Sequence, residues 1–275
     1  MDKARISKGL VLAGWVLAAF TGCETVDSGT KLSANGNVNQ RRTYVCPLVE
    51  EAPIIDGDLN DPAWKRATLI DQFYRYPDST DREPVPVARG TVRARIAYDA
   101  ENLYVGMTID DPDIVVNPAG TEDEKETMYL DGDVFEIFLM PGSNKTCYYE
   151  MHVNPLNVTW DTRFRARRYM RFADLAVWDS GGETAVALHG TVNTMDTDAG
   201  WSAEVAVPFA SITNRGGEKV DVASGDAWRF TLCFYDYAYQ HDDGENGSSL
   251  RYLSSAKLHR LGYHFRGDYD TMRFQ

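Results

Sequence analysis

Alternation of apolar and polar side chains with a period of two is the feature that most constrains the fold of this chain. The stretch Val92–Tyr98 alternates, residues 99–102 are turn formers, and Leu103–Met107 alternates again. Because successive side chains of a strand point to opposite faces, this pattern predicts a β-hairpin. Further strands, separated by Gly, Pro, Asn and Asp, are expected at Val134–Met140, Tyr148–Asn154, Asn157–Asp161, Thr184–Val192, Trp201–Pro208, Trp228–Tyr237, Arg251–Ala256 and Thr271–Phe274.

Many short strands at this spacing predict an all-β protein, a single antiparallel β-sandwich of jelly-roll-like type with few short helices. One helical turn is expected at Asp61–Ala67. A hydrophobic content of 43% is sufficient for a packed core. No Pro/Ser-rich linker and no internal repeat divides residues 43–275, so we interpret them as one domain.

The first 22 residues have the layout of a secretory signal. Lys3, Arg5 and Lys8 precede the apolar run Leu10–Phe20, which is too short to span a bilayer comfortably. The following Thr21-Gly22-Cys23 resembles the lipobox of bacterial lipoproteins, which implies cleavage before Cys23 and lipidation of its thiol. A buried or disulfide-bonded Cys23 is the alternative.

Residues 23–42 are polar and rich in Gly, Ser and Asn, as in a flexible tether that would follow the lipidated cysteine. The expected localisation is therefore the bacterial cell envelope, on its periplasmic or surface face, with the lipid anchor as the only membrane contact.

Charge and cysteine content exclude several function classes. A net charge of −13 argues against nucleic-acid binding and against adhesion to anionic lipid. Without a C-x-x-C motif or a Cys/His cluster, the sequence predicts no zinc or redox motif. Cys233 is expected to be a buried thiol, whereas a disulfide between Cys46 and Cys147 stays open.

Five short stretches and a C-terminal pattern carry a family resemblance. The stretches are, in order, APIIDGDLNDPAW (52–64), AYDAENLYV (97–105), DGDVFEIFL (131–139), YYEMHVNPLN with WD (148–161) and GWSAEVAVP (200–208), followed by Tyr263-His264, Tyr269 and Phe274. Together they resemble family 9 carbohydrate-binding modules and their DOMON-like relatives. The resemblance implies a β-sandwich that binds oligo- or polysaccharide without catalysis, sometimes with bound calcium. Envelope enzymes that degrade glycans would be natural partners.

The second predicted hairpin offers polar groups for sugar recognition. Glu136 lies on one of its strands, and His152 and Asn154 share a face of the other. If the register pairs Glu136 with His152, a carboxylate, an imidazole and an amide converge, a combination suited to sugar hydroxyls. A solvated outer sheet face is the alternative. By resemblance, Glu136 and His152 match ligand-contacting positions, although Arg is frequent in the family where His152 stands.

Aromatic rings for sugar stacking are expected at three positions. The resemblance places two stacking tryptophans where this chain has Leu130, with Tyr129 beside it, and Tyr263. Trp160 could supply a third ring near the same face, or could belong to the core. The predicted carbohydrate-binding residues are therefore Tyr129, Glu136, His152, Asn154, Trp160 and Tyr263.

Two charged clusters have a functional and an ordinary interpretation. Oxygen ligands for calcium are available at Asp56, Asp58, Asn60 and Asp61, but Asx-turns explain the same run without metal. Arginines 163, 165, 167, 168 and 171 could bind an acidic polysaccharide or pair with carboxylates of the protein itself.

Two other functions compete with sugar binding. DOMON-type relatives bind haem, and Met151, His152 and His264 are available as ligands for a non-covalent haem of an electron-transfer domain. A glycoside hydrolase would need two flanking carboxylates, for which Glu136 and Glu150 are candidates. We favour a non-catalytic binding domain.

Overall fold

The computed structural model describes most of the chain from residue 41 onward. The described ranges are 41–77, 83–88, 91–117, 132–142, 147–164, 178–213, 217–238, 250–260 and 262–275. They all belong to one compact unit, Asn39–Gln275. The predicted signal peptide, Cys23, Tyr129 and arginines 165–171 lie outside these ranges. Within them, no helix has the length and apolar character needed to cross a membrane.

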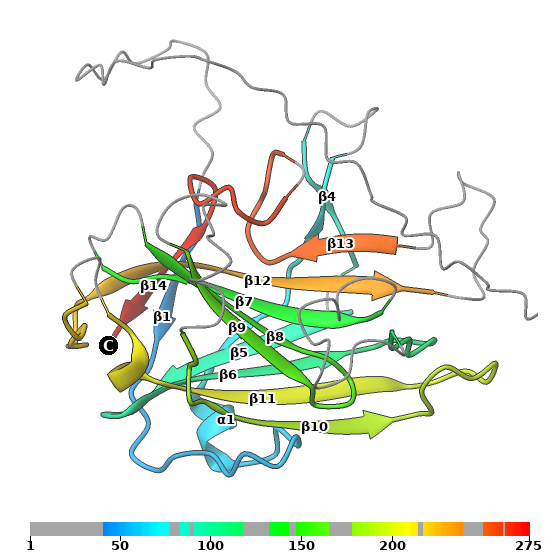
Figure 1. The fold of residues 1–275 in the computed structure, drawn as a ribbon, viewed down its shortest axis with the longest axis horizontal. Helices are drawn as coiled ribbons and strands as arrows, with labels where there is room; N and C mark the ends of the chain where they lie inside the picture. Colours follow the sequence, from blue (N-terminus) through cyan, green and yellow to red (C-terminus); the bar gives the residue numbers. More distant parts are fainter. Residues whose placement is uncertain are drawn as a thin grey trace, which may run out of the picture. The chain divides into compact units, whose positions relative to one another are not determined.

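The described residues form strands almost throughout (Figure 1). In chain order the strands are β1 (Thr43–Cys46), β2 (Thr68–Ile70), β3 (Tyr74–Arg75), β4 (Val85–Pro86), β5 (Val92–Tyr98), β6 (Asn102–Ile109), β7 (Val134–Met140), β8 (Tyr148–Val153), β9 (Thr159–Phe164), β10 (Glu183–His189), β11 (Gly200–Pro208), β12 (Ala227–Tyr237), β13 (Leu250–Ser254) and β14 (Asp270–Phe274). The helical elements of these ranges are α1 (Pro62–Arg66) and the 3₁₀ turn η2 (Phe209–Ser211).

The strands make two sheets. The larger, sheet A, has the order β4-β3-β13-β12-β7-β8-β9, with β14 joining β12 to β1. The smaller, sheet B, has the order β10-β11-β6-β5-β2. Neighbouring strands run antiparallel, apart from the parallel pair β1–β14. The predicted β-sandwich is thus confirmed.

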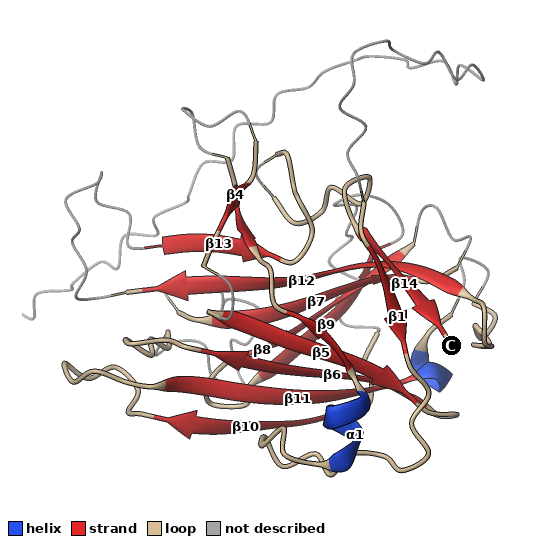
Figure 2. Cartoon of the chain, turned by 180° about the vertical axis from the view of Figure 1, so that it is seen from behind, coloured by secondary structure: helices blue, strands red, loops and turns tan. Residues whose placement is uncertain are grey.

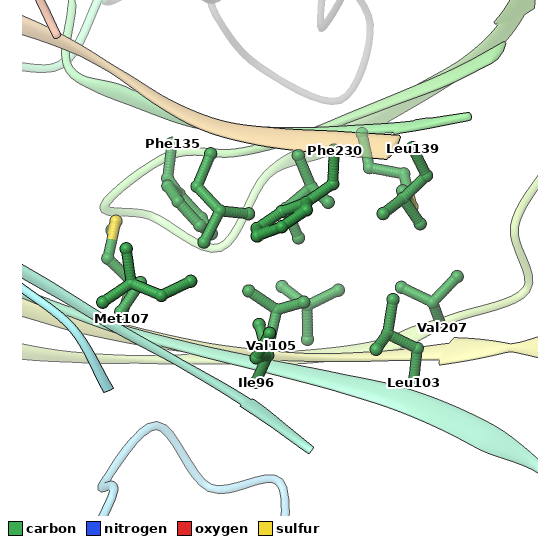
Figure 3. Close-up of a cluster of buried hydrophobic side chains, with 14 of the residues drawn as sticks. Ile96, Leu103, Val105, Met107, Phe135, Leu139, Val207 and Phe230 are labelled. Atoms are coloured by element: carbon green, nitrogen blue, oxygen red, sulfur yellow. The ribbon is translucent and has the colours of Figure 1, made fainter. Parts of the chain in front are cut away.

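The core lies between the two sheets (Figure 3). Phe135, Leu139 and Phe230 of sheet A face Ile96 and Val105 of sheet B, and all of these side chains are buried. Because Phe135 and Leu139 point inward, the alternate residues of β7 point away from sheet B. This alternation places Glu136 on the outer face of sheet A.

Helix α1 packs on sheet B, beside β5 (Figure 2). Its Trp64 is fully buried with Tyr104 and Ala206, residues that point away from the core between the sheets. The short helix therefore covers the outer face of sheet B.

Strand boundaries agree with the predictions to within a few residues, with one clear shift. The strand predicted at Asn157–Asp161 begins at Thr159, because Asn157 has a φ of 57° and belongs to the preceding turn. Strands β1 to β4 were not individually predicted.

The three described cysteines, Cys46, Cys147 and Cys233, are all free and buried. The disulfide between Cys46 and Cys147 that the sequence left open is therefore absent from this structure. Cys233 packs among apolar side chains on the outer side of sheet A, which confirms its interpretation as a buried thiol.

Candidate functional site

A row of polar and aromatic residues crosses the outer face of sheet A. The strand register pairs Glu136 of β7 with His152 of β8, and His152 with Trp160 of β9. This is the register under which the two strands bring Glu136 and His152 together. The His152 and Trp160 rings meet edge to face, with centroids 4.8 Å apart. Three of the predicted residues thus adjoin one another on three neighbouring strands.

Two carboxylates converge on one imidazole nitrogen in this row. His152 Nε2 lies 2.7 Å from Glu150 Oε1 and 3.1 Å from Glu136 Oε1. Glu150 and His152 are two residues apart on β8, so they share a face. Burial, together with the neighbouring charge of Glu150, raises the pKa of Glu136 well above its usual range. The cluster is an acidic site with little access to water.

An aromatic cluster covers this region. Tyr263 is 3% exposed, and its ring lies 5.1 Å from that of Tyr76, 5.3 Å from Tyr235 and 5.9 Å from Phe138, measured between centroids. Its hydroxyl donates a 3.0 Å hydrogen bond to the Phe234 carbonyl. Tyr263 therefore lies near the site but is packed as a core side chain, without an open ring face for stacking.

Asn154 and Trp160 both make contacts that support the fold. Asn154 Oδ1 accepts hydrogen bonds from the amides of Leu156 at 3.0 Å and Val158 at 2.9 Å, which holds the turn between β8 and β9. Trp160 is half-buried and packs against Val134 and Val158. A sugar-binding role for these two residues, and for Tyr129 outside the described ranges, stays a prediction.

Several buried polar atoms of this face make no hydrogen bond within the described part of the chain. They are Glu136 Oε2, Glu150 Oε2, Asn154 Nδ2 and Thr162 Oγ1. Thr162 pairs with Glu150 in the register of β8 and β9, so these atoms lie on adjoining strands. Buried polar groups are normally satisfied, and each exception requires a reason.

The acidic loop proposed for calcium is bonded to itself. Asp56 Oδ1 accepts the Asp58 amide at 2.9 Å, Asp58 Oδ2 accepts the Asn60 side-chain amide at 2.7 Å, and Asp61 Oδ2 accepts the Ile54 amide at 2.8 Å. The first of these bonds is that of an Asx-turn, and the other two join side chains and backbone within the same loop. Calcium at this loop stays a prediction.

The arginine cluster can be followed only at its first member. Arg163 Nε contacts Cys147 Sγ at 3.0 Å, and its guanidinium carbon lies 5.9 Å from the centroid of the Tyr149 ring. Tyr149 faces the core between the sheets. Arg163 is therefore on the side of the sheet opposite Glu150 and His152.

The structure also bears on the two competing functions. Met151 packs in the core between the sheets, on the face opposite His152, so the two cannot ligate the same haem. Glu136 and Glu150 both approach His152, with the nearest atoms within 4.8 Å of one another. Glycosidases hold their carboxyl groups about 5 Å or more apart to accommodate the substrate. Neither competing function is supported.

Sequence reasoning missed how the site is enclosed. It left Glu150 out of the predicted carbohydrate-binding residues, although the alternation of Tyr148–Asn154 puts Glu150 on the same face as His152. It did not include Tyr76 or Tyr235 among the aromatic neighbours, because nothing local in the sequence connects residue 76 with residue 235.

The comparisons with known proteins agree on one family. The model of the carbohydrate family 9 binding domain-like family matches residues 55–246. A family 9 carbohydrate-binding module from Caldicellulosiruptor kristjanssonii in complex with cellotriose is 13% identical, with a TM-score of 0.52, covering 85% of this chain and 94% of that one. A family 9 module from the same organism in complex with glucose is also 13% identical, with a TM-score of 0.53, covering 85% of this chain and 96% of that one.

A candidate carbohydrate-binding protein from Bacteroides uniformis is 13% identical, with a TM-score of 0.56, covering 86% of this chain and 100% of that one. At this identity the structural likenesses support the fold alone. No curated protein matches the chain. Because the family model spans well over half of the sequence, this chain belongs to the carbohydrate family 9 binding domain-like family, a family of binding domains rather than enzymes.

Proposed function

We propose that this chain binds oligo- or polysaccharide, without catalysis, through the outer face of sheet A around Glu136, His152 and Trp160. The observation that carries the proposal is the row these residues form across β7, β8 and β9 in a member of a carbohydrate-binding family. Two solved structures of the same fold are family 9 modules in complex with cellotriose and with glucose.

The chemistry of the row suits a sugar. Carboxylate oxygens of Glu136 and Glu150 accept hydrogen bonds from hydroxyls, and the Trp160 ring offers an apolar surface for a pyranose face. The buried atoms without a hydrogen bond, Glu136 Oε2 and Thr162 Oγ1 among them, could gain their partners from ligand hydroxyls.

Access to the row depends on its cover. Glu136 and His152 are each 2% exposed, and Tyr263 packs nearby within the aromatic cluster. A sugar reaches these two side chains only if covering groups shift on binding. Trp160, which is half-buried, would be the first contact.

We further propose that the protein is exported and held at the bacterial cell envelope by a lipid on Cys23. The support is the basic and then apolar order of residues 1–22 with Thr21-Gly22-Cys23 at its end. Glycan-degrading enzymes of the envelope are the protein partners that such a location suggests.

Calorimetric titration of the purified chain tests sugar binding. Glucose and cellotriose are the first ligands, followed by an array of plant and bacterial glycans. Saturable binding that Glu136→Gln and Trp160→Ala each weaken at least tenfold supports the site. Glu101→Gln, which changes an exposed carboxylate in the turn between β5 and β6, is the control. The absence of saturable binding to every glycan tested would overturn the proposal.

Membrane fractionation tests the anchor. The native chain should partition with membranes and incorporate labelled fatty acid, whereas Cys23→Ser should do neither. Equal behaviour of the two would exclude lipidation at Cys23.

A further inference from the structure

We propose that Glu136, Glu150 and His152 bind a divalent transition-metal ion such as Zn²⁺. Each of these residues offers one ligand atom, and the three atoms lie within 4.8 Å of one another. This inference goes beyond the proposed function, because metal binding here requires no sugar.

Two of the three distances within the cluster are close to those between metal ligands. His152 Nε2 is 2.7 Å from Glu150 Oε1 and 3.1 Å from Glu136 Oε1. Ligands held about 2.1 Å from a zinc ion at right angles are about 3.0 Å apart, and at the tetrahedral angle about 3.4 Å. Small side-chain movements would therefore place an ion between the three atoms.

Charge and burial favour a divalent ion. As metal ligands, the two carboxylates and the imidazole would together contribute two negative charges, which one divalent cation neutralises. Glu136 is 2% exposed, and its Oε2 makes no hydrogen bond to the described residues. A bound divalent ion would compensate the carboxylate charges that burial otherwise disfavours.

The donor set selects among metals. One imidazole nitrogen with two carboxylate oxygens suits zinc, iron and manganese, whereas calcium prefers six to eight oxygens. We therefore expect Zn²⁺ to bind more tightly than Ca²⁺. The resulting set has one nitrogen and two oxygens and leaves coordination positions for water or another ligand.

A second histidine lies beside the cluster without a hydrogen bond to Glu150. Glu150 Oε2 is 3.9 Å from His264 Nδ1, which is beyond hydrogen-bond distance, and His264 Nδ1 is itself 2.9 Å from the Tyr148 hydroxyl. Glu150 Oε2 is therefore not held by His264 in this structure.

Metal titration of the full chain tests the proposal. After treatment with a chelator and dialysis, the protein is titrated with ZnCl₂ and separately with CaCl₂, in the absence of sugar. We expect one Zn²⁺ per chain, no displacement of that Zn²⁺ by added CaCl₂, and visible absorption bands when Co²⁺ replaces Zn²⁺. Glu150→Gln and His152→Gln should each weaken Zn²⁺ binding at least tenfold.

His259→Gln is the matched control. His259 Nε2 also faces a carboxylate, Glu83 Oε2 at 3.1 Å, but lies outside the cluster. It should keep the native Zn²⁺ affinity. Circular dichroism shows whether each variant is folded. If a variant does not fold, two measurements on the native chain still test metal binding. They are the rise in its thermal midpoint with added Zn²⁺ and the absorption spectrum of its Co²⁺ form.

Two results would overturn the proposal. One is the absence of saturable Zn²⁺ binding to the native chain. The other is equal Zn²⁺ affinity in Glu150→Gln, His152→Gln and His259→Gln. Because no sugar is present, neither result depends on whether the chain binds carbohydrate.

Discussion

The indole N–H of Trp64 donates a 2.5 Å hydrogen bond to Oε1 of Glu204, 140 residues further along the chain. Oε2 of Glu204 accepts the amides of Asp56 at 2.8 Å and Gly57 at 2.6 Å. One buried carboxylate thus fastens the N-terminal loop and α1 to sheet B. Two of the stretches that carry the family resemblance meet at this contact, and here they have a structural role.

Glu204→Gln should destabilise the fold. A carboxamide keeps the shape but has a single acceptor oxygen, so its NH₂ group would face N–H donors. We expect a loss of about 2–3 kcal/mol in the free energy of unfolding, from charge-assisted hydrogen bonds left unmade. Urea denaturation measures it. Glu101→Gln, an exposed carboxylate change, should be nearly neutral; an equal effect of both variants would contradict this role of Glu204.

Gly57 should not tolerate a side chain. Its φ is +92°, and a Cβ there would lie 2.6 Å from backbone atoms of Val186 and Ala187. Gly225 provides the matched control, with a φ of +96° and nothing within 4 Å of a built Cβ. Gly225→Ala should cost about 1–2 kcal/mol from backbone strain alone.

Gly57→Ala should cost clearly more, because strand β10 would have to move. Thermal denaturation of the two variants under the same conditions compares them. Similar midpoints would show that the close approach of Gly57 to β10 is not tight in solution.

The regular part of the fold was predictable from local sequence, and the short strands were not. Val92–Tyr98 has an uninterrupted period of two and a polar turn after it, so its ends agree with β5. Strands β3 and β4 contain two residues each and cannot display a period. Tertiary packing pairs β3 with β13 and β4 with β3.

The sequence was enough to predict that the site residues share one sheet face, but not that they are buried. Alternation along two strands was enough to bring Glu136 and His152 together, given the register. The same face of sheet A carries an aromatic cluster whose members include Tyr76 and Tyr263, far apart in sequence. No local pattern specifies such a contact, so Tyr263 was expected to be a stacking surface.

Tyr263 should contribute strongly to stability. Its buried ring and the 3.0 Å hydrogen bond to the Phe234 carbonyl belong to the cover of sheet A. Tyr263→Phe should cost about 1 kcal/mol for the lost hydrogen bond. Tyr263→Ala should cost about 3–5 kcal/mol for the cavity as well. A chemical denaturation series with both variants measures the two effects, and an unchanged midpoint in Tyr263→Ala would show that the ring is exposed in solution.

A second group of buried carboxylates makes stability depend on pH. Asp111 lies just beyond β6, and burial raises its pKa to about 7, against the opposing hydrogen bond from the Asp113 amide. Burial likewise raises the pKa of Asp236 to about 6, although Arg251, 2.7 Å away, opposes this shift. Asp133, which also faces Asp111, has a pKa well above its usual range, first through burial and then through the charge of Asp111.

These shifts fix the direction of the pH dependence. A carboxyl group whose pKa is higher in the folded than in the unfolded state holds more protons when folded. The free energy of unfolding therefore falls as pH rises from about 4, the unfolded value, through about 6 for Asp236 and about 7 for Asp111. Urea midpoints at pH 5 and pH 8, at constant ionic strength, should show the protein more stable at pH 5 with respect to these groups.

Asp111→Asn isolates one contribution. Asparagine keeps the oxygen that accepts the Asp113 amide at 3.1 Å but cannot ionise. The variant should gain on the order of 2 kcal/mol relative to the native chain at pH 8 and little at pH 5, which flattens the dependence. Asp110→Asn, which alters an exposed carboxylate paired with Arg93, should leave the slope as it is. If Asp111→Asn loses stability at both pH values, the Asp111 carboxylate is ionised and satisfied in the folded protein, and the pH dependence must originate elsewhere.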